Sequence, residues 1–103
     1  MKKRYIEHPQ VRTFFAGQKA EVRAEYARSV AALEAYGFLT APMGEKVEAG
    51  LFAIRIRKGG NVRVFYVYDA GNYVYGLHAY EKKTREIPLH ELALARRRMN
   101  EIG

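Results

Sequence analysis

Basic side chains stand inside the most strand-like part of this sequence. Between Gly50 and Lys83 the chain reads GLFAIRIRKGGNVRVFYVYDAGNYVYGLHAYEKK, which places Arg55, Arg57, Arg63 and His78 among aliphatic and tyrosine side chains. A cation inside a strand is costly unless an anion meets it, because burial removes the water that solvates the charge. A phosphate backbone is the simplest such anion, so we expect the functional residues in this segment.

Arg63 is the sharpest candidate in the segment. The strands expected over 51–57, 62–68 and 73–80 contain no Asp or Glu, so the sequence offers Arg63 no ion pair within them. The alternative is a structural arginine that pairs with a more distant carboxylate or reaches water past the sheet edge. We therefore predict that Arg63 stabilises a phosphate.

Two strand registers around Arg63 are compatible with the sequence. If both connecting turns are two-residue loops, Arg63 lies opposite Ile56 on one side and His78 on the other. A bulge in the KGGN turn would instead place Arg63 on the same face as Arg55 and Arg57. Under either register Arg63 has a basic neighbour in the middle of the sheet.

The remaining candidates fit roles around the same phosphate. His78 could act as general acid or base because imidazole titrates near neutral pH, although a lone histidine is more often structural. Tyr80 lies between His78 and Lys82 and suits stacking against an unpaired base, although strand tyrosines commonly serve packing. Arg57 and Lys58 end the first strand, and Lys82 and Lys83 follow the third, where they could contact the same anion or be ordinary solvated charges.

Composition limits the classes of protein to consider. The 103 residues suit one domain, and 18 Lys and Arg against 11 Asp and Glu give a formal charge of +7, which favours a polyanionic partner. There is no cysteine, and the three histidines are scattered, so we expect neither a metal site nor a cofactor. No apolar run approaches the ~20 residues that span a bilayer, so we expect a cytoplasmic protein without a membrane partner.

Two helices are expected before the strands. Residues 3–7 could form a short edge strand, and Pro9 suits the first turn of a helix that ends near Phe15. From Gln18 to Tyr36 one apolar stripe predicts a second helix, with Gly37 as its C-terminal stop. Residues 38–50, which contain Pro42, Gly44 and Gly50, read as a connecting loop.

The strands over 51–57, 62–68 and 73–80 form an antiparallel meander, and a helix follows Pro88. The apolar stripe of this last helix is Leu92, Ala95, Met99 and Ile102. Helices and strands that do not alternate predict an α+β fold, with helices packed on one sheet face and the opposite face free to bind.

The order of these motifs resembles the RelE/HigB toxin superfamily, and most closely its phage-derived HigB-like branch. The similarity lies in GLFAIRI at 50–56, VRVFY at 62–66, LHAYEKKT at 77–84, and the proline-started helix with Ala95 and Arg96. It covers about residues 20 to 101. Ala53 departs from the pattern, because a Glu is common at that position.

The resemblance implies a RelE-like fold and the toxin of a type II toxin–antitoxin pair. Such toxins are basic, metal-independent endoribonucleases that cut mRNA in the ribosomal A site, and an adjacent helix-turn-helix antitoxin neutralises them. Residue by residue, it matches Arg63, Arg55 and the Lys82-Lys83 pair to the family's basic positions, and His78 and Tyr80 to its LHGF positions. With the function that it implies, we predict a catalytic set of Arg55, Arg63, His78 and Lys83, and an RNA-contacting set of Arg57, Lys58, Tyr80 and Lys82. The alternatives are a non-catalytic RNA- or ribosome-binding module, or a small interaction protein with an acidic partner.

Overall fold

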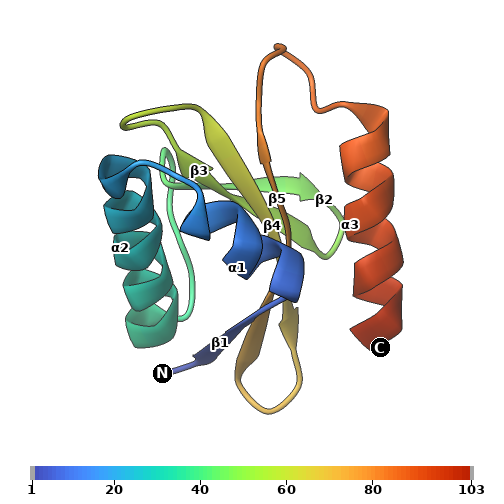
Figure 1. Cartoon of the computed structure of the whole chain (residues 1–103). Helices are drawn as coiled ribbons and strands as arrows, with labels where there is room; N and C mark the ends of the chain where they lie inside the picture. The colour runs from blue at the N-terminus through green and yellow to red at the C-terminus, as the bar shows by residue number, and fades with distance from the viewer. Residues whose placement is uncertain (1, 103) are drawn as a thin grey trace.

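A five-stranded sheet in the order β1-β5-β4-β3-β2 forms the middle of the molecule (Figure 1). The structure is a computed structural model that describes residues 2–102. In chain order the elements are β1 (Arg4–Glu7), α1 (Pro9–Ala16), α2 (Ala20–Tyr36), β2 (Gly44–Glu48), β3 (Leu51–Ile56), β4 (Val62–Asp69), β5 (Tyr73–Glu81) and α3 (Leu89–Ile102).

The predicted α+β class is confirmed, and so are its three central strands. β4 is hydrogen-bonded to β3 and β5, both antiparallel, which explains why its side chains are buried on both faces from Val62 to Val67. β1 is the expected N-terminal edge strand, but it runs parallel to β5. The sheet is therefore mixed rather than purely antiparallel.

The prediction of a loop over 38–50 is wrong for its second half, because β2 lies within it. β2 pairs antiparallel with β3 and is an edge strand. Its sequence, GEKVE, has one aliphatic residue and three charged ones, and glycine or proline stands on both sides. An edge strand with charged side chains lacks the apolar pattern that identifies a strand, so the sequence gives mainly turn signals here.

The register differs from the one that two-residue loops predict. Arg63 lies opposite Arg55 on β3 and opposite Tyr80 on β5, and not opposite Ile56 or His78. The pairing with Arg55 comes from a longer first turn, since Ile56 pairs with Val62 and residues 57–61 connect them. The pairing with Tyr80 comes from a second turn over residues 70–72 and from a register shift between Phe65 and Tyr66. The alternative that placed Arg63 on the face of Arg55 is therefore confirmed, although turn length rather than a bulge produces it.

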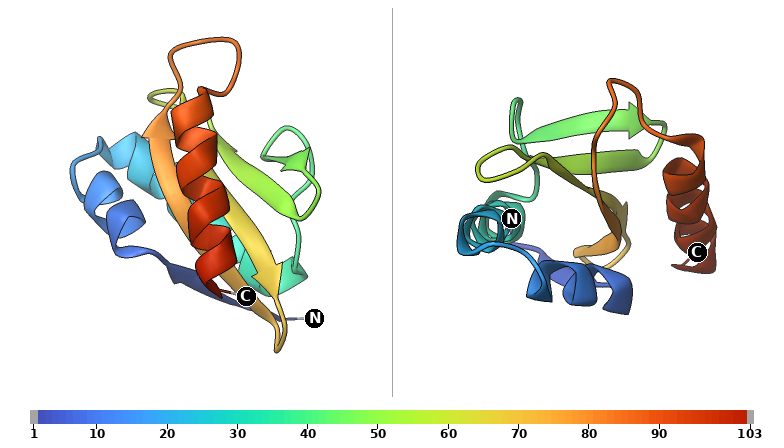
Figure 2. Two further views of the ribbon diagram at one scale, coloured as in Figure 1. Left: turned by 90° about the vertical axis from the view of Figure 1, so that its right-hand side faces the viewer. Right: turned by 45° about the horizontal axis from the view of Figure 1, so that its top comes forward.

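Helices cover both faces of the sheet. α1 and α2 pack on one face through a core that includes Val11, Val22 and Leu33, whereas α3 packs on the other through Leu92, Ala95 and Met99. Figure 2 shows α3 lying across the sheet on the side away from α1 and α2. The expectation of one free face is therefore wrong for the part beneath α3, because that helix has its own apolar stripe to bury.

Local signals at the helix ends agree with the sequence. His8 precedes α1, and its Nδ1 accepts a hydrogen bond from the Gln10 backbone N–H at 3.0 Å. Gly37 ends α2 with φ of +84° and donates its N–H to the Leu33 carbonyl, as a left-handed C-terminal glycine does. These local signals mark the start of α1 and the end of α2.

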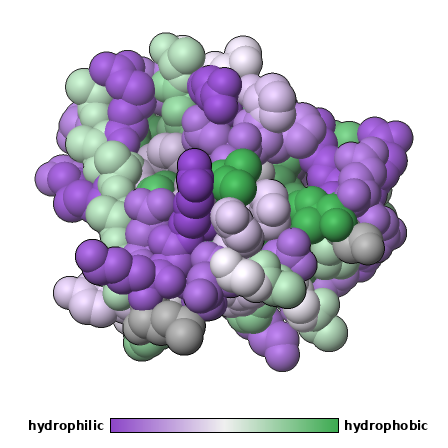
Figure 3. Space-filling model, turned by 90° about the horizontal axis from the view of Figure 1, so that it is seen from below, coloured by the Kyte–Doolittle hydropathy of each residue, from purple (hydrophilic) through white to green (hydrophobic). Residues whose placement is uncertain are grey.

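Seen from below, the surface of the molecule is largely hydrophilic (Figure 3). On this side hydrophobic side chains come to the surface in separate small groups. The large apolar side chains that are exposed are Ile6 on β1, Tyr36 and Phe38 at the end of α2, and Leu89 at the start of α3. Such scattered exposure is ordinary for a folded chain. No helix within residues 2–102 combines the length and the apolar character needed to cross a membrane.

Candidate functional site

Three buried polar atoms without a hydrogen-bond partner in residues 2–102 lie in one row across the sheet. They are Arg55 Nε on β3, Arg63 Nε on β4 and Tyr80 Oη on β5. Arg55 is directly opposite Arg63, and Arg63 is directly opposite Tyr80, so all three side chains share one face. A buried polar atom without a partner costs about 1–3 kcal/mol. This Arg55–Arg63–Tyr80 row is therefore suited to an anion with several acceptor oxygens.

Arg63 is 4% exposed and is held from both sides of its guanidinium. Its Nη1 donates to Asn61 Oδ1 at 2.8 Å and to the Val62 carbonyl at 3.2 Å. Its Nε lies 3.4 Å from Glu45 Oε1, close enough for an ion pair but not aligned for a hydrogen bond. Burial lowers the pKa of Arg63, Glu45 opposes that change, and Arg55 adds to it. Arginine nevertheless stays charged at neutral pH.

Tyr80 supplies a hydroxyl group at the other end of the row. Its ring lies beside those of Phe65 and His78, nearly parallel to both, with centroid separations of 5.6 and 6.2 Å. Burial raises the pKa of Tyr80 to about 12, although the neighbouring charge of Arg63 acts in the opposite direction. The hydroxyl is therefore protonated near neutral pH and is available as a hydrogen-bond donor.

His78 lies on the same face, but α3 engages both of its ring nitrogens. Nε2 is 2.6 Å from Glu91 Oε1, and Nδ1 is 3.0 Å from Arg98 Nη1. Because arginine can only donate, Nδ1 accepts and Nε2 carries the proton that it donates to Glu91. Burial lowers the pKa of His78, which Glu91 partly offsets. This geometry favours a structural role that ties β5 to α3 over the predicted acid–base role.

The other predicted basic residues lie where the β3–β4 turn meets the end of β5. Arg57 and Lys58 are exposed directly after β3, and Lys82 and Lys83 follow β5. The Lys82 backbone N–H donates to the Asn61 carbonyl at 2.7 Å, and Asn61 Nδ2 donates to the Lys82 carbonyl at 3.0 Å. Lys83 is exposed and lies 3.6 Å from Glu81. The structure thus places these four cations at the same end of the sheet as the row.

The sequence did not indicate four residues that contact the candidate site. Glu45 falls in the segment that the sequence predicts as a loop. Glu91 and Arg98 belong to the last helix, and the sequence does not predict that this helix covers the face of the row. Asn61 falls in the predicted KGGN turn, and an asparagine next to two glycines is typical of a turn residue whose side chain bonds to the backbone. The alternative in which Arg63 pairs with a more distant carboxylate is what the structure shows, because Glu45 on the overlooked strand β2 lies 3.4 Å from Arg63 Nε.

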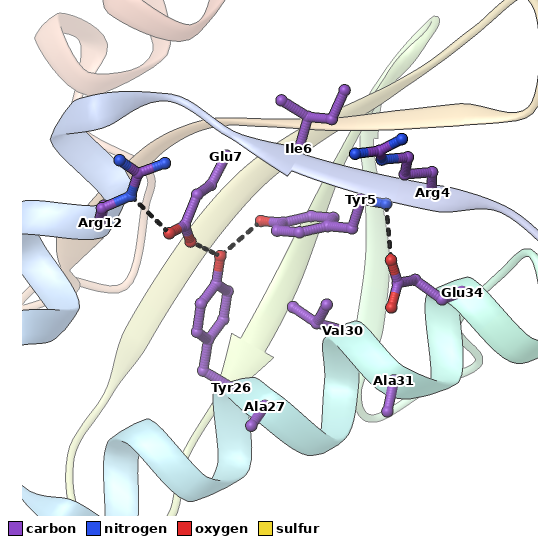
Figure 4. Close-up of a pocket in the computed structure, with 10 residues that line it drawn as sticks. All are labelled: Arg4, Tyr5, Ile6, Glu7, Arg12, Tyr26, Ala27, Val30, Ala31 and Glu34. Carbon is purple, nitrogen blue, oxygen red and sulfur yellow. Dashed lines mark hydrogen bonds and ion pairs between the residues drawn. The ribbon is translucent and has the colours of Figure 1, made fainter.

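The largest of the described cavities lies away from the row. It has a volume of about 540 Å³ and is formed between β1 and α2 (Figure 4). There the Tyr26 hydroxyl donates to Glu7 Oε2 at 2.7 Å, and Tyr5 Oη lies 2.9 Å from Tyr26 Oη. These groups satisfy one another and join β1 to α2, so we interpret them as structural. Within residues 2–102 no three acidic or histidine side chains gather as a metal site would require.

Comparison with known proteins identifies a family to which the sequence is similar and a solved structure with a similar fold. Residues 13–100 match the model of a family described as "Phage derived protein Gp49-like". Among solved structures, a similar one is the E. coli toxin RelE, a double arginine-to-alanine mutant in the free state, with a TM-score of 0.72 and 11% sequence identity. The alignment covers 96% of this chain and 99% of that chain. No curated protein matches this sequence.

Proposed function

This chain belongs to the Gp49-like family of phage-derived proteins and has the fold of RelE, and from this premise we propose that it is the toxin of a type II toxin–antitoxin pair. Its activity would be that of a metal-independent endoribonuclease that cuts mRNA on the ribosome in the cytoplasm. The observation that carries this proposal is the Arg55–Arg63–Tyr80 row, where buried donors stand without partners on the face of a basic sheet.

The chemistry that suits this row is attack of an RNA 2′-hydroxyl on the adjacent phosphorus. A bond forms between O2′ and phosphorus, the bond to O5′ breaks, and negative charge grows on the phosphate oxygens in between. Arg55 and Arg63 would stabilise that charge, and the protonated Tyr80 hydroxyl would donate a further hydrogen bond. His78 would hold Tyr80 by stacking rather than transfer a proton itself.

The surrounding cations would bind the RNA strand on either side of the cut. Arg57, Lys58, Lys82 and Lys83 lie at the end of the sheet next to the row, where they could contact successive phosphates. A site built mainly from cations works by positioning and electrostatics, so its activity would depend on the ribosome to arrange the mRNA. The partners proposed for the chain are therefore ribosome-bound mRNA and a cognate antitoxin, of the helix-turn-helix type.

Induced expression in bacteria tests this function. The wild type should arrest growth and leave mRNA ends that map to the ribosomal A site. Arg63→Ala should lower the cleavage rate by about 10²-fold or more, because it removes a charge-stabilising donor from the transition state. Arg28→Ala is the matched control, since Arg28 is an exposed arginine of α2 on the other side of the sheet.

The outcomes of this experiment distinguish the proposed endoribonuclease from the two alternative functions. Undiminished cleavage by Arg63→Ala would show that the site is misassigned. If purified wild-type protein binds ribosomes but leaves the mRNA intact, the chain is a non-catalytic ribosome-binding module. If the wild-type protein neither cuts nor binds RNA, the chain is a small interaction protein whose acidic partner is another protein.

A further inference from the structure

We propose that Glu45 on β2 is the proton acceptor of this site. The proposal rests on the endoribonuclease function proposed above and names the residue that would remove the proton from the attacking 2′-hydroxyl. Nothing in the sequence of the central strands suggests it, because the carboxylate reaches the row from a neighbouring edge strand.

The position of Glu45 follows from the pairing of β2 with β3. Glu45 is directly opposite Ala53, so its side chain projects on the face that also carries Arg55 and Arg63. The small side chain of Ala53 leaves the carboxylate free to extend over β3 toward β4. There Glu45 Oε1 lies 3.4 Å from Arg63 Nε, and the Glu45 side chain is 35% exposed. It therefore touches both the buried row and the solvent from which RNA would arrive.

Other groups near the row are poorly placed to accept the proton. His78 is 5% exposed, and its acceptor nitrogen already receives a hydrogen bond from Arg98. Tyr80 is protonated at neutral pH. Glu91 is bound to His78 Nε2 at 2.6 Å.

Lys83 and Glu81 are no better placed. Lys83 is exposed and pairs with Glu81, 3.6 Å away. Glu81 is opposite Val62, which packs in the core beneath α1 and α2, so its side chain projects on the other face of the sheet. Among the carboxylates that the structure places around the row, Glu45 is the one with an open approach to a substrate.

The proton balance of the step is simple. Glu45 takes the 2′-hydroxyl proton as O2′ bonds to phosphorus, and the departing O5′ takes a proton from water. The products are a 2′,3′-cyclic phosphate and a 5′-hydroxyl, after which Glu45 returns its proton to solvent. Arg63 and Arg55 stay cationic throughout and hold the phosphate beside the carboxylate.

Glu45→Gln tests the assignment, because it preserves the shape of the side chain but cannot accept the proton. Single-turnover cleavage of a defined mRNA bound to purified ribosomes is measured against pH. We expect Glu45→Gln to slow cleavage by about 10²–10³-fold and to remove the acid limb of the pH–rate profile, with unchanged affinity for the programmed ribosome. Glu45→Asp should keep the acid limb, and Glu48→Gln, on the same strand, should cleave at the wild-type rate.

Each other result overturns the assignment in a recognisable way. A wild-type rate for Glu45→Gln would leave the endoribonuclease function standing without Glu45 as acceptor. A slower Glu45→Gln that keeps the acid limb, or that loses ribosome affinity to the same extent, would show that Glu45 only positions Arg63. A wild-type protein that cuts no mRNA would overturn the proposed function, and the role of Glu45 with it. Urea unfolding of each variant confirms that the fold is retained.

Discussion

At the scale of single residues, three of the four buried side-chain polar atoms that have no hydrogen-bond partner within residues 2–102 lie together, and the fourth is Ser29 Oγ on α2. Arg55 Nε, Arg63 Nε and Tyr80 Oη are buried without hydrogen-bond partners in the described chain, and they are neighbours across three strands. Glu45 lies beside Arg63, at 3.4 Å from its Nε, whereas Arg55 Nε has no partner. Folds tolerate such groups where function requires them, because stability is given up for a preorganised site.

Tyr80→Phe should therefore make the protein more stable and less active. The substitution removes a buried hydroxyl that has no partner, so the free energy of unfolding should rise by up to about 1 kcal/mol. It also removes the proposed donor to the phosphate, so mRNA cleavage should fall. Urea unfolding and a ribosome-dependent cleavage assay measure the two effects. A variant that is both destabilised and fully active would show that the hydroxyl is structural.

The buried His78 gives the fold a pH dependence of known sign. Burial lowers its pKa below 6.5 in the folded chain, whereas in the unfolded chain it titrates near 6.5. The unfolded chain then takes up a proton that the folded chain refuses. The contribution of neutral His78 to the free energy of unfolding is therefore complete above about pH 6.5. It is lost as the pH falls from there toward the pKa of His78 in the folded chain. His78→Gln should flatten this part of the curve of unfolding free energy against pH.

His8 provides the control for that measurement. Burial also lowers its pKa, although His8 is much less enclosed than His78. Asparagine is a good helix N-cap and should preserve the bond to the Gln10 N–H. His8→Asn should therefore keep most of the acid-side loss of stability. If His78→Gln keeps as much of it as His8→Asn, groups other than His78 produce the effect.

At the scale of elements, the edges of the sheet do much of the positioning. β2 brings Glu45 to Arg63, and α3 fixes His78 through Glu91 and Arg98. On the opposite edge, β1 lies beside β5, and the Tyr5 ring lies over Gly76. A side chain at residue 76 would place its Cβ 2.0 Å from Tyr5 Oη, so this glycine is needed for the close approach.

Gly76→Ala should lower the free energy of unfolding by roughly 1–3 kcal/mol through this clash. In a Tyr5→Ala background the same change should cost much less, because the obstructing ring is gone. Urea unfolding of the two single variants and the double variant gives the coupling directly. Gly17→Ala is the matched control, since its Cβ would meet only the Phe14 carbonyl oxygen, at 3.8 Å. Equal costs in both backgrounds would mean that the loss comes from the strand itself.

At the scale of the whole molecule, the charge of +7 governs how the protein meets a polyanion. Binding to single-stranded RNA should weaken as salt rises, with a logarithmic slope of about −0.7 for each phosphate contacted. Lys82→Ala should reduce the magnitude of that slope by roughly one contact, whereas Arg28→Ala on α2 should not. Fluorescence anisotropy over a salt series measures both. Equal slopes in the two variants would argue that net charge alone, rather than this end of the sheet, binds RNA.

The sequence by itself determined most of the local structure of this protein, with β2 as the exception. Apolar periodicity and the stop at Gly37 specify α2, and glycine-rich turns between aliphatic runs specify β3, β4 and β5. These signals are local, because they depend on backbone preference and on which side of an element is apolar. The order of the strand motifs and of the final helix was also enough to indicate the family, and it singled out Arg63 as a cation inside a sheet.

Only the tertiary structure decided what surrounds Arg63. A turn over residues 57–61, whose length the glycines did not specify, places Arg63 opposite Arg55. The turn over residues 70–72 and an irregularity in the β4–β5 pairing between Phe65 and Tyr66 make Tyr80 rather than His78 the other neighbour of Arg63. Glu45 arrives from an edge strand too polar to be recognised, and Arg98 reaches His78 from α3. Such contacts join segments far apart in the chain. Their formation depends on how faces pack and not on local sequence preference.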